Sequence, residues 1–156
     1  IPPGATSDKL ISLSGMMATI CAAADIPLPR EASDSLNQLP LLTHPQIDRA
    51  IRTEMVFHGL EGLALRSNDW DYLPVQGSMG YTAPPTKSWG LPYAELGFIN
   101  SDLDRDGKPR PEAPPAQLYN LRQDPRQSTN LYDQEPEVVR RLAERLREIT
   151  GQEESH

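Results

Sequence analysis

The chain of 156 residues carries 22 acidic and 15 basic side chains, which gives a formal net charge of -7 at neutral pH. This charge argues against nucleic acid or an anionic membrane as the main partner, because both are polyanions. With 37% hydrophobic residues, 6% aromatic residues and 16 prolines, we expect about one domain with a modest core and much irregular backbone. No run reaches about 18 apolar residues, so no membrane-spanning helix is predicted. The single cysteine, Cys21, excludes an internal disulfide, and its apolar neighbours in the sequence predict a buried, inert thiol.

Residues 7–26 predict a strand that runs into a helix. The apolar strand covers residues 10–13, and Ser14 is the expected N-cap of the helix, because a serine hydroxyl can accept from the first free amides. Apolar side chains at helical spacing then extend over residues 16–24. Asp25 is expected to end the helix, since aspartate tolerates the left-handed conformation.

Antiparallel strands are predicted next. One short strand is expected at residues 55–57, and a hairpin is expected from residues 63–66 and 70–73, joined by a turn at 67–69. Arg66 lies on a regular strand of this hairpin, so we expect it to tie the hairpin down by hydrogen bonds.

A long segment without periodicity follows at residues 74–116, and it holds half of the prolines. So long an irregular stretch inside a compact domain is usually a functional loop or a disordered one. Within it, the run D-L-D-R-D-G at residues 102–107 imitates the first half of a calcium-binding loop. Ala113 stands where a complete loop has its bidentate glutamate, so the run is interpreted as an acidic turn and no metal ligand is assigned.

The stretch Q-L-Y-N-L at residues 117–121 predicts a short buried strand, followed by a sharp turn at residues 124–125. Asn130 is expected to satisfy nearby backbone groups with its side-chain amide. The last predicted element is a helix at residues 136–150, which has an apolar stripe along one side and Gly151 as its expected end.

The run QLYNLRQDPRQSTNLYDQEPEVVRRLAERL, which begins at Gln117, resembles the C-terminal signature of the arylsulfatase-like sulfatases of the alkaline phosphatase superfamily. That signature is usually written Q-L-Y-[ND]-L-x-x-D-P-x-E-x-x-N-L. Two positions depart from it. Arg126 stands where the family often has glycine, and Gln127 stands where it often has glutamate.

Three further stretches resemble the same family and lie in the same order along the chain. Residues 12–29 follow the pattern S-L-x-D-L-x-P-T-x-x-x-x-A-G-I-P-L-P, with Gly15 in place of the usual aspartate. Residues 39–42 match the segment S-L-L-P-L-L. From His58 onward the hairpin follows H-x-x-x-G-x-A-[IV]-R-x-G-x-W-K-[LY]-[IV], with Asp71 in place of the common lysine. The resemblance therefore covers nearly the whole chain.

The resemblance implies an α+β fold in two parts. Residues 1–45 would form a strand-helix segment that belongs to the larger α/β catalytic domain of a sulfatase. Residues 46–156 would form a C-terminal subdomain, in which a small antiparallel sheet packs on the helix at residues 136–150. The loop at residues 74–116 would lie beside the substrate cleft.

The resemblance also implies hydrolysis of sulfate esters, of either an aryl sulfate or a sulfated carbohydrate. In that family a C/S-x-P-x-R motif supplies a formylglycine nucleophile, and paired aspartates with a D-N-G motif hold calcium. None of these motifs occurs in the sequence, so no catalytic residue is assigned. We expect the chain to be part of a longer polypeptide whose N-terminal catalytic part supplies them. An extracytoplasmic location (periplasmic, secreted or lysosomal) is implied as well.

Four residues are candidates for substrate binding: His58, Gln76, Lys87 and Trp89. A lysine can meet a sulfate or carboxylate group, and the face of a tryptophan can stack on a sugar ring. The resemblance implies that His58 lies near the pocket mouth. Two alternatives stay open, namely that His58 has only structural contacts and that Trp89 only pins the loop to the domain.

Two other functions also stay open at this stage. One keeps the superfamily but hydrolyses phosphodiesters or phosphonate esters. The other is a non-enzymatic binding module, in which the loop at residues 74–116 is the ligand surface.

Overall fold

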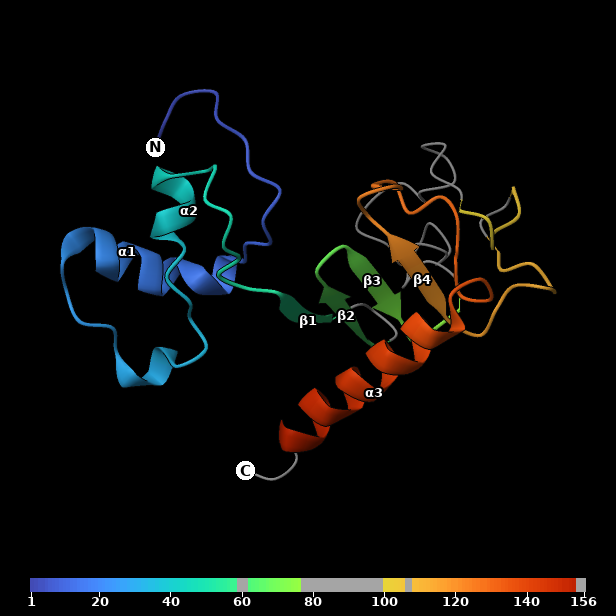
Figure 1. Cartoon of the computed structure of the whole chain (residues 1–156). Coiled ribbons are helices and arrows are strands. Elements are labelled where there is room, and N and C mark those ends of the chain that lie inside the picture. The colour runs from blue at the N-terminus through green and yellow to red at the C-terminus, as the bar shows by residue number, and fades with distance from the viewer. Residues whose placement is uncertain (59–61, 77–99, 106–107, 154–156) are drawn as a thin grey trace. The chain divides into compact units, whose positions relative to one another are not determined.

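The computed structural model describes residues 1–58, 62–76, 100–105 and 108–153. The chain forms two compact units, Ile1–Glu54 and Met55–His156, which are called the N-terminal unit and the C-terminal unit. Figure 1 shows short helices in the first unit, and a sheet with one long helix in the second.

Two helices and two 3-10 turns build the N-terminal unit: η1 (Leu13–Gly15), α1 (Met16–Ala24), η2 (Arg30–Ala32) and α2 (Leu39–Thr43). The predicted helix at residues 16–24 is confirmed. Its predicted end is confirmed too, because Asp25 has a left-handed φ of 54°. Cys21 is buried in this unit, as expected.

The strand predicted at residues 10–13 is wrong, because the chain enters η1 instead. A strand needs a neighbour for its backbone groups, and here the side chain of Gln38 takes that place at Ser12. Gln38 accepts a hydrogen bond from the Ser12 amide and donates one to the Ser12 carbonyl, both at 2.7 Å. The apolar run at residues 10–13 therefore does not indicate a strand.

Gly15, and not Ser14, is the N-cap of α1. A Cβ atom at Gly15 would collide with the side-chain amide of Gln38 and with the carbonyl of Leu36. The glycine at this position, where the sulfatase pattern has aspartate, therefore has a local cause. It leaves room for the side chain of Gln38, which is hydrogen-bonded to the backbone of Ser12.

The described part of the C-terminal unit holds a four-stranded antiparallel sheet, with strands in the order β1 (Glu54–His58), β2 (Leu63–Ser67), β3 (Trp70–Leu73) and β4 (Gln117–Asn120). All four strands lie where the sequence predicts them. The β2–β3 turn is tight, because Ser67 pairs with Trp70 and Asn68 adopts a φ of 50°, which asparagine tolerates. Arg66 donates from Nε to the Asn68 carbonyl at 2.7 Å, so its predicted role in tying down the hairpin is confirmed.

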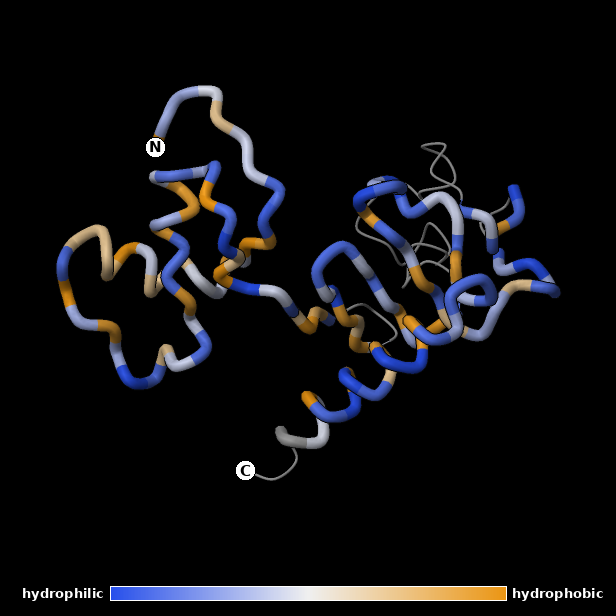
Figure 2. The backbone as a smooth tube through the Cα atoms, in the orientation of Figure 1, coloured by the Kyte–Doolittle hydropathy of each residue, from blue (hydrophilic) through white to orange (hydrophobic). Residues whose placement is uncertain are grey.

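One face of the sheet packs against α3 (Pro136–Glu153). Alternate strand residues meet the apolar stripe of the helix there, and the buried side chains of this cluster include Leu65, Tyr72, Leu118, Leu142 and Leu146. In Figure 2, α3 is mostly hydrophilic with separate hydrophobic positions, as a helix buried on one side requires. The predicted α+β class, with a small antiparallel sheet packed on a C-terminal helix, is confirmed.

The helix is longer than the sequence predicts. Gly151 does not end it, and the helix continues to Glu153. Glycine ends a helix by entering the left-handed conformation, and Gly151 remains helical instead. On the exposed side, Arg140 forms ion pairs with Glu137 at 2.8 Å and with Glu144 at 3.4 Å. Exposed pairs of this kind contribute little to stability.

Candidate functional site

A layer of buried and half-buried polar side chains lies next to the sheet in the C-terminal unit. Successive strand residues point to opposite faces, so Ala64, Leu73 and Tyr119 point away from α3 and pack together in a second apolar cluster. Around them, loop side chains meet polar strand side chains. The polar layer consists of Asp71, Asn100, Asp102, Gln117, Tyr119, Gln127 and Asn130.

Tyr119 and Gln117 connect β4 to the segments on both sides of residues 77–99. The Tyr119 hydroxyl donates to Gln117 Oε1 at 2.6 Å and accepts from the Asn100 side chain at 2.8 Å. Gln117 also donates from Nε2 to the Val75 carbonyl at 3.0 Å. Burial, and then the charge of Asp102, raise the pKa of Tyr119, so its hydroxyl stays protonated and remains a donor. Gln117 thus contacts residues 75 and 100 at once.

Asn130 is the most connected side chain of the polar layer. Its Oδ1 accepts from the amides of Leu118 at 2.9 Å and Tyr132 at 3.0 Å. Its Nδ2 donates to Asp102 Oδ2 at 2.6 Å and to the Ala116 carbonyl at 3.0 Å. The predicted role of Asn130 in satisfying backbone groups is confirmed, and it extends across the fold to Asp102.

The acidic segment at residues 102–107 is tied into the fold where the structure describes it. Asp102 is buried, and its two carboxylate oxygens accept from Asn130 and from the Ser101 hydroxyl. Asp104 Oδ1 accepts from the Lys108 amide at 2.9 Å, which closes a turn. Across the described ranges, no group of three or more His, Cys, Asp or Glu residues is placed to hold a metal ion. The last two residues of the run, 106 and 107, lie outside the described residues.

The structure places two of the four predicted substrate-binding residues. His58 ends β1 and is exposed. Gln76 is exposed just after β3, and its Nε2 donates to the Ala113 carbonyl at 2.8 Å. Lys87 and Trp89 lie outside the described residues. The substrate-binding set therefore stays a prediction.

Asp71 is a candidate that the sequence analysis did not select. The residue is 5% exposed on β3, and its Oδ2 accepts from the Gln127 side chain at 2.6 Å. Within the described structure, its Oδ1 has no hydrogen-bond partner. Burial raises the pKa of Asp71 to about 6, although Arg66 and Gln127 favour the ionised form. One signal in the sequence pointed here, because Asp71 and Gln127 both depart from the sulfatase pattern and the structure brings them into contact.

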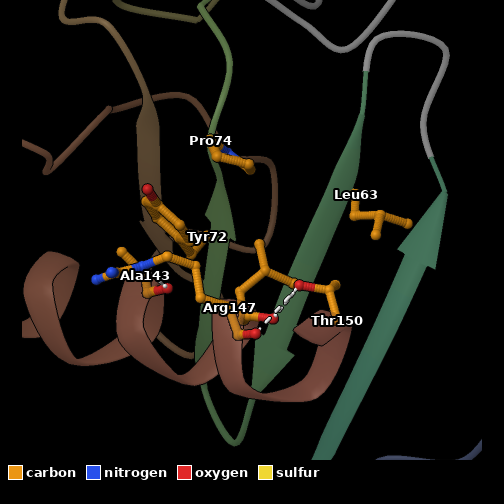
Figure 3. A pocket seen from close by; sticks show the side chains of 7 residues that line it. Leu63, Tyr72, Pro74, Ala143, Arg147 and Thr150 are labelled. Carbon is orange, nitrogen blue, oxygen red and sulfur yellow. Dashed lines mark hydrogen bonds between the residues drawn. The ribbon is translucent and has the colours of Figure 1, made fainter. Parts of the chain in front are cut away.

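A cavity of about 380 Å³ lies between the sheet and α3 (Figure 3). Side chains from β2, β3, the residue after β3, and α3 line it: Leu63, Tyr72, Pro74, Ala143, Leu146, Arg147 and Thr150. The Thr150 hydroxyl is already bonded to the Leu146 carbonyl of its own helix at 2.9 Å. Neither His58 nor Gln76, the two predicted substrate-binding residues that the structure describes, lines this cavity. The described lining is mostly apolar, and among its residues only Arg147 carries a cationic group.

The arrangement holds loops in place, and among the described residues it brings together no group of three or more His, Cys, Asp or Glu side chains that could hold a metal ion. The arrangement positions loops. Partly buried hydrogen bonds hold Val75 and Asn100 against β4, and an exposed hydrogen bond holds Gln76 to the Ala113 carbonyl. As for membranes, no helix in the described ranges combines the length and the apolar character needed to cross one.

No protein-family model matches the chain, and no curated protein matches it. Among solved structures, it is similar to a sulfatase of Bacteroides thetaiotaomicron that is described with the metabolism of multiple glycosaminoglycans. The identity is 27% and the TM-score 0.54, over 86% of this chain and 24% of that chain. The present chain thus spans about a quarter of the length of the protein that it matches. In sequence and in fold, the chain is therefore similar to part of a sulfatase.

Proposed function

We propose that this chain is the C-terminal part of a sulfatase that hydrolyses sulfate esters, and that it shapes the substrate cleft while the nucleophile and the metal ligands lie upstream. The observation that carries the proposal is the similarity to a sulfatase over 86% of the chain, at 27% identity. The signature at residues 117–131 supports it, because that stretch forms β4 and the turn that anchors the polar layer.

The surface of the N-terminal unit supports an upstream partner within the same protein. Leu13 is 89% exposed, and on α1 Met17 is 52% and Ile20 57% exposed. Within the described residues, every exposed large hydrophobic side chain lies in this unit. Soluble domains seldom leave so many apolar side chains on one small unit uncovered. The occupant that we propose is the N-terminal catalytic part, which residues 1–45 would complete.

The C-terminal unit supports the role in the cleft. Gln117 contacts the Val75 carbonyl and the side chain of Asn100, so one residue of β4 holds described residues of the predicted substrate loop on both sides of positions 77–99. Gln76 is fixed in the same region by the Ala113 carbonyl. In the proposal, these hydrogen bonds help to position the segment that contains Lys87 and Trp89 beside a sulfated substrate, and His58 lies at the base of that segment.

The substrate class that we propose is a sulfated carbohydrate, with an aryl sulfate as the simpler alternative. The similar sulfatase is described with glycosaminoglycan metabolism, which favours the carbohydrate. An extracytoplasmic location follows from the same family resemblance. Formylglycine and calcium are assigned to the upstream part, since this sequence has no C/S-x-P-x-R motif and the described residues bring no metal-binding group together.

The test uses the complete protein that contains these 156 residues. We expect it to release sulfate from a sulfated carbohydrate and from an aryl sulfate, and to release far less phosphate from an aryl phosphodiester. The purified 156-residue chain, as the matched control, should release neither. Phosphate release that exceeds sulfate release would move the proposal to the phosphodiesterases, and turnover by the short chain would overturn it.

A second test concerns the loop. In the complete protein, Lys87→Ala and Trp89→Ala should lower turnover of the sulfated carbohydrate and spare a small aryl sulfate, which has little leaving group to contact. Equal losses on both substrates would indicate a folding defect, and no loss on either would remove the loop from the substrate site.

A further inference from the structure

We propose that Asp71 and Gln127 form a pH-dependent latch, which holds the turn at residues 124–127 and the attached segment 100–103 on the sheet. The latch is a single contact between a strand and a distant turn. Asp71 Oδ2 accepts from Gln127 Nε2 at 2.6 Å, and 56 positions separate the two residues in sequence.

The contact holds a turn whose backbone is unfavourable by itself. Gln127 has a left-handed φ of 54°, which side chains other than those of glycine, asparagine and aspartate rarely adopt. Within the turn, the Gln127 amide donates to the Asp124 carbonyl at 3.1 Å. The hydrogen bond that Gln127 donates to Asp71 fixes the side chain of Gln127 and therefore favours this conformation over the alternatives.

The turn at residues 124–127 is also linked, through Ser128 and Asn130, to the segment at residues 100–103. The Ser101 amide donates to the Ser128 carbonyl at 2.8 Å, and the Asn130 amide donates to Ser101 Oγ at 2.9 Å. Ser101 is followed by Asp102, whose carboxylate accepts from Asn130. Movement of the turn is therefore transmitted to residues 100–103, which belong to the predicted substrate loop.

The ionisation of Asp71 controls the strength of the latch. Gln127 favours the ionised carboxylate, but burial in the closed latch opposes ionisation more strongly and raises the pKa of Asp71 to about 6. The residue is 5% exposed and its Oδ1 has no hydrogen-bond partner among the described residues, so a charge on that oxygen has no donor there. Ionisation of this one group therefore favours release of the contact, without disturbing the apolar cluster against α3.

The neighbouring groups leave Asp71 as the group that titrates near neutral pH. Arg66 on β2 is paired with Asp71 across the strands and favours its ionised form. Tyr119, opposite Asp71 on β4, stays protonated because burial raises its pKa. Burial of Asp124 opposes ionisation, but hydrogen bonds from Thr129 and Ser128 prevail and lower its pKa, so it stays ionised as Asp71 titrates.

The sequence departures agree with this assignment. The sulfatase pattern has lysine at position 71 and glutamate at position 127, two groups of opposite charge. This chain has aspartate and glutamine there, and the structure places them in contact. In this chain the two positions therefore form a polar contact that contains one ionisable group.

The first experiment measures the pKa of Asp71 by carboxyl-carbon NMR in the 156-residue chain. We expect a value near that given by burial, about 6. Gln127→Ala should raise it further, because the hydrogen bond favours the ionised form. Gln134→Ala, an exposed glutamine in the same connecting region, should not change it. An ordinary aspartate pKa, or an equal shift in both variants, would overturn the latch.

The second experiment measures hydrogen-exchange protection of the Ser101 amide, corrected for the intrinsic rate, at about pH 8 and about pH 5. We expect a several-fold loss of protection at the higher pH in the unmodified chain, because the buried carboxyl is ionised there. Asp71→Asn, which removes the ionisable group, should show no such change and a constantly high protection. A loss of the same size in Asp71→Asn, or no loss in the unmodified chain, would contradict the proposal.

Discussion

The two units of this protein differ in how they bury their apolar residues. In the C-terminal unit, α3 and the sheet enclose Leu65, Leu118 and Leu142, each 2% exposed or less. In the N-terminal unit, Leu13 and Ile20 are more than half exposed, although both belong to apolar runs. The C-terminal unit therefore has a core of its own. The N-terminal unit has apolar runs as well, but many of their side chains remain exposed. Apolar side chains stabilise a fold only where something removes them from water.

The largest expected effect lies in the core of the C-terminal unit. Leu142→Ala removes a side chain that is 2% exposed at the contact between α3 and the sheet. We expect a loss of about 2–5 kcal/mol in the free energy of unfolding, because the deletion leaves a cavity. Denaturant unfolding of the 156-residue chain measures it. A loss as small as that of a surface substitution would mean that α3 does not hold this unit together.

The next effect concerns the polar layer. Asn130→Ala leaves the amides of Leu118 and Tyr132 without their side-chain acceptor, and takes a donor from the buried Asp102. We expect a loss of about 3 kcal/mol, since buried polar groups without partners each cost about 1–3 kcal/mol. Gln134→Ala, an exposed glutamine of the same unit, is the control in the same unfolding assay. Equal losses in the two variants would show that the polar layer contributes nothing specific.

A smaller effect is expected at Asp71, where substitution should raise the free energy of unfolding at about pH 8. Its pKa is raised from 3.8 to about 6, so the folded state binds a proton more tightly than the unfolded state. Its contribution to stability is therefore fully present below pH 3.8 and is lost as the pH rises to about 6. At about pH 8, Asp71→Asn should stabilise the chain by about 1 kcal/mol, because it removes a buried charge.

Unfolding midpoints of the Asp71→Asn variant and the unmodified chain between about pH 4 and about pH 8 test this sign. The difference in favour of the variant should grow as the pH rises. A difference that is constant with pH would show that Asp71 is not the group that titrates.

The smallest expected effect sharpens the comparison between the units. Ile20→Ser changes a side chain that is 57% exposed, so unfolding of the 156-residue chain should change by less than about 0.5 kcal/mol. Cys21→Ser, on the same helix and with the same new side chain, should cost more, because Cys21 is buried. In the longer protein that we propose, Ile20→Ser should become clearly destabilising. A cost that stays negligible there would mean that the proposed catalytic part does not cover α1.

The local elements of this protein were predictable wherever a short pattern decides the backbone. The strands of the sheet, the turn at Asn68, the left-handed end of α1 at Asp25 and the stripe of α3 all follow from alternation, helical spacing and residue chemistry within a few positions. The strand predicted at residues 10–13 was wrong for the complementary reason. A strand depends on a neighbour, and the backbone of Ser12 is bonded to a side chain 26 positions away instead.

The site shows the same limit. The sequence indicated that Asn130 serves the backbone, because asparagine in a tight turn does so locally, but its bond to Asp102 required the fold. It also marked Asp71 and Gln127 as two unrelated departures from a pattern. Only the tertiary structure brought them to 2.6 Å and buried the carboxylate. Composition and spacing determine which segments become strand, turn or helix, whereas burial, and with it the pKa of a single side chain, depends on residues that lie far away in the sequence and meet only in the folded chain.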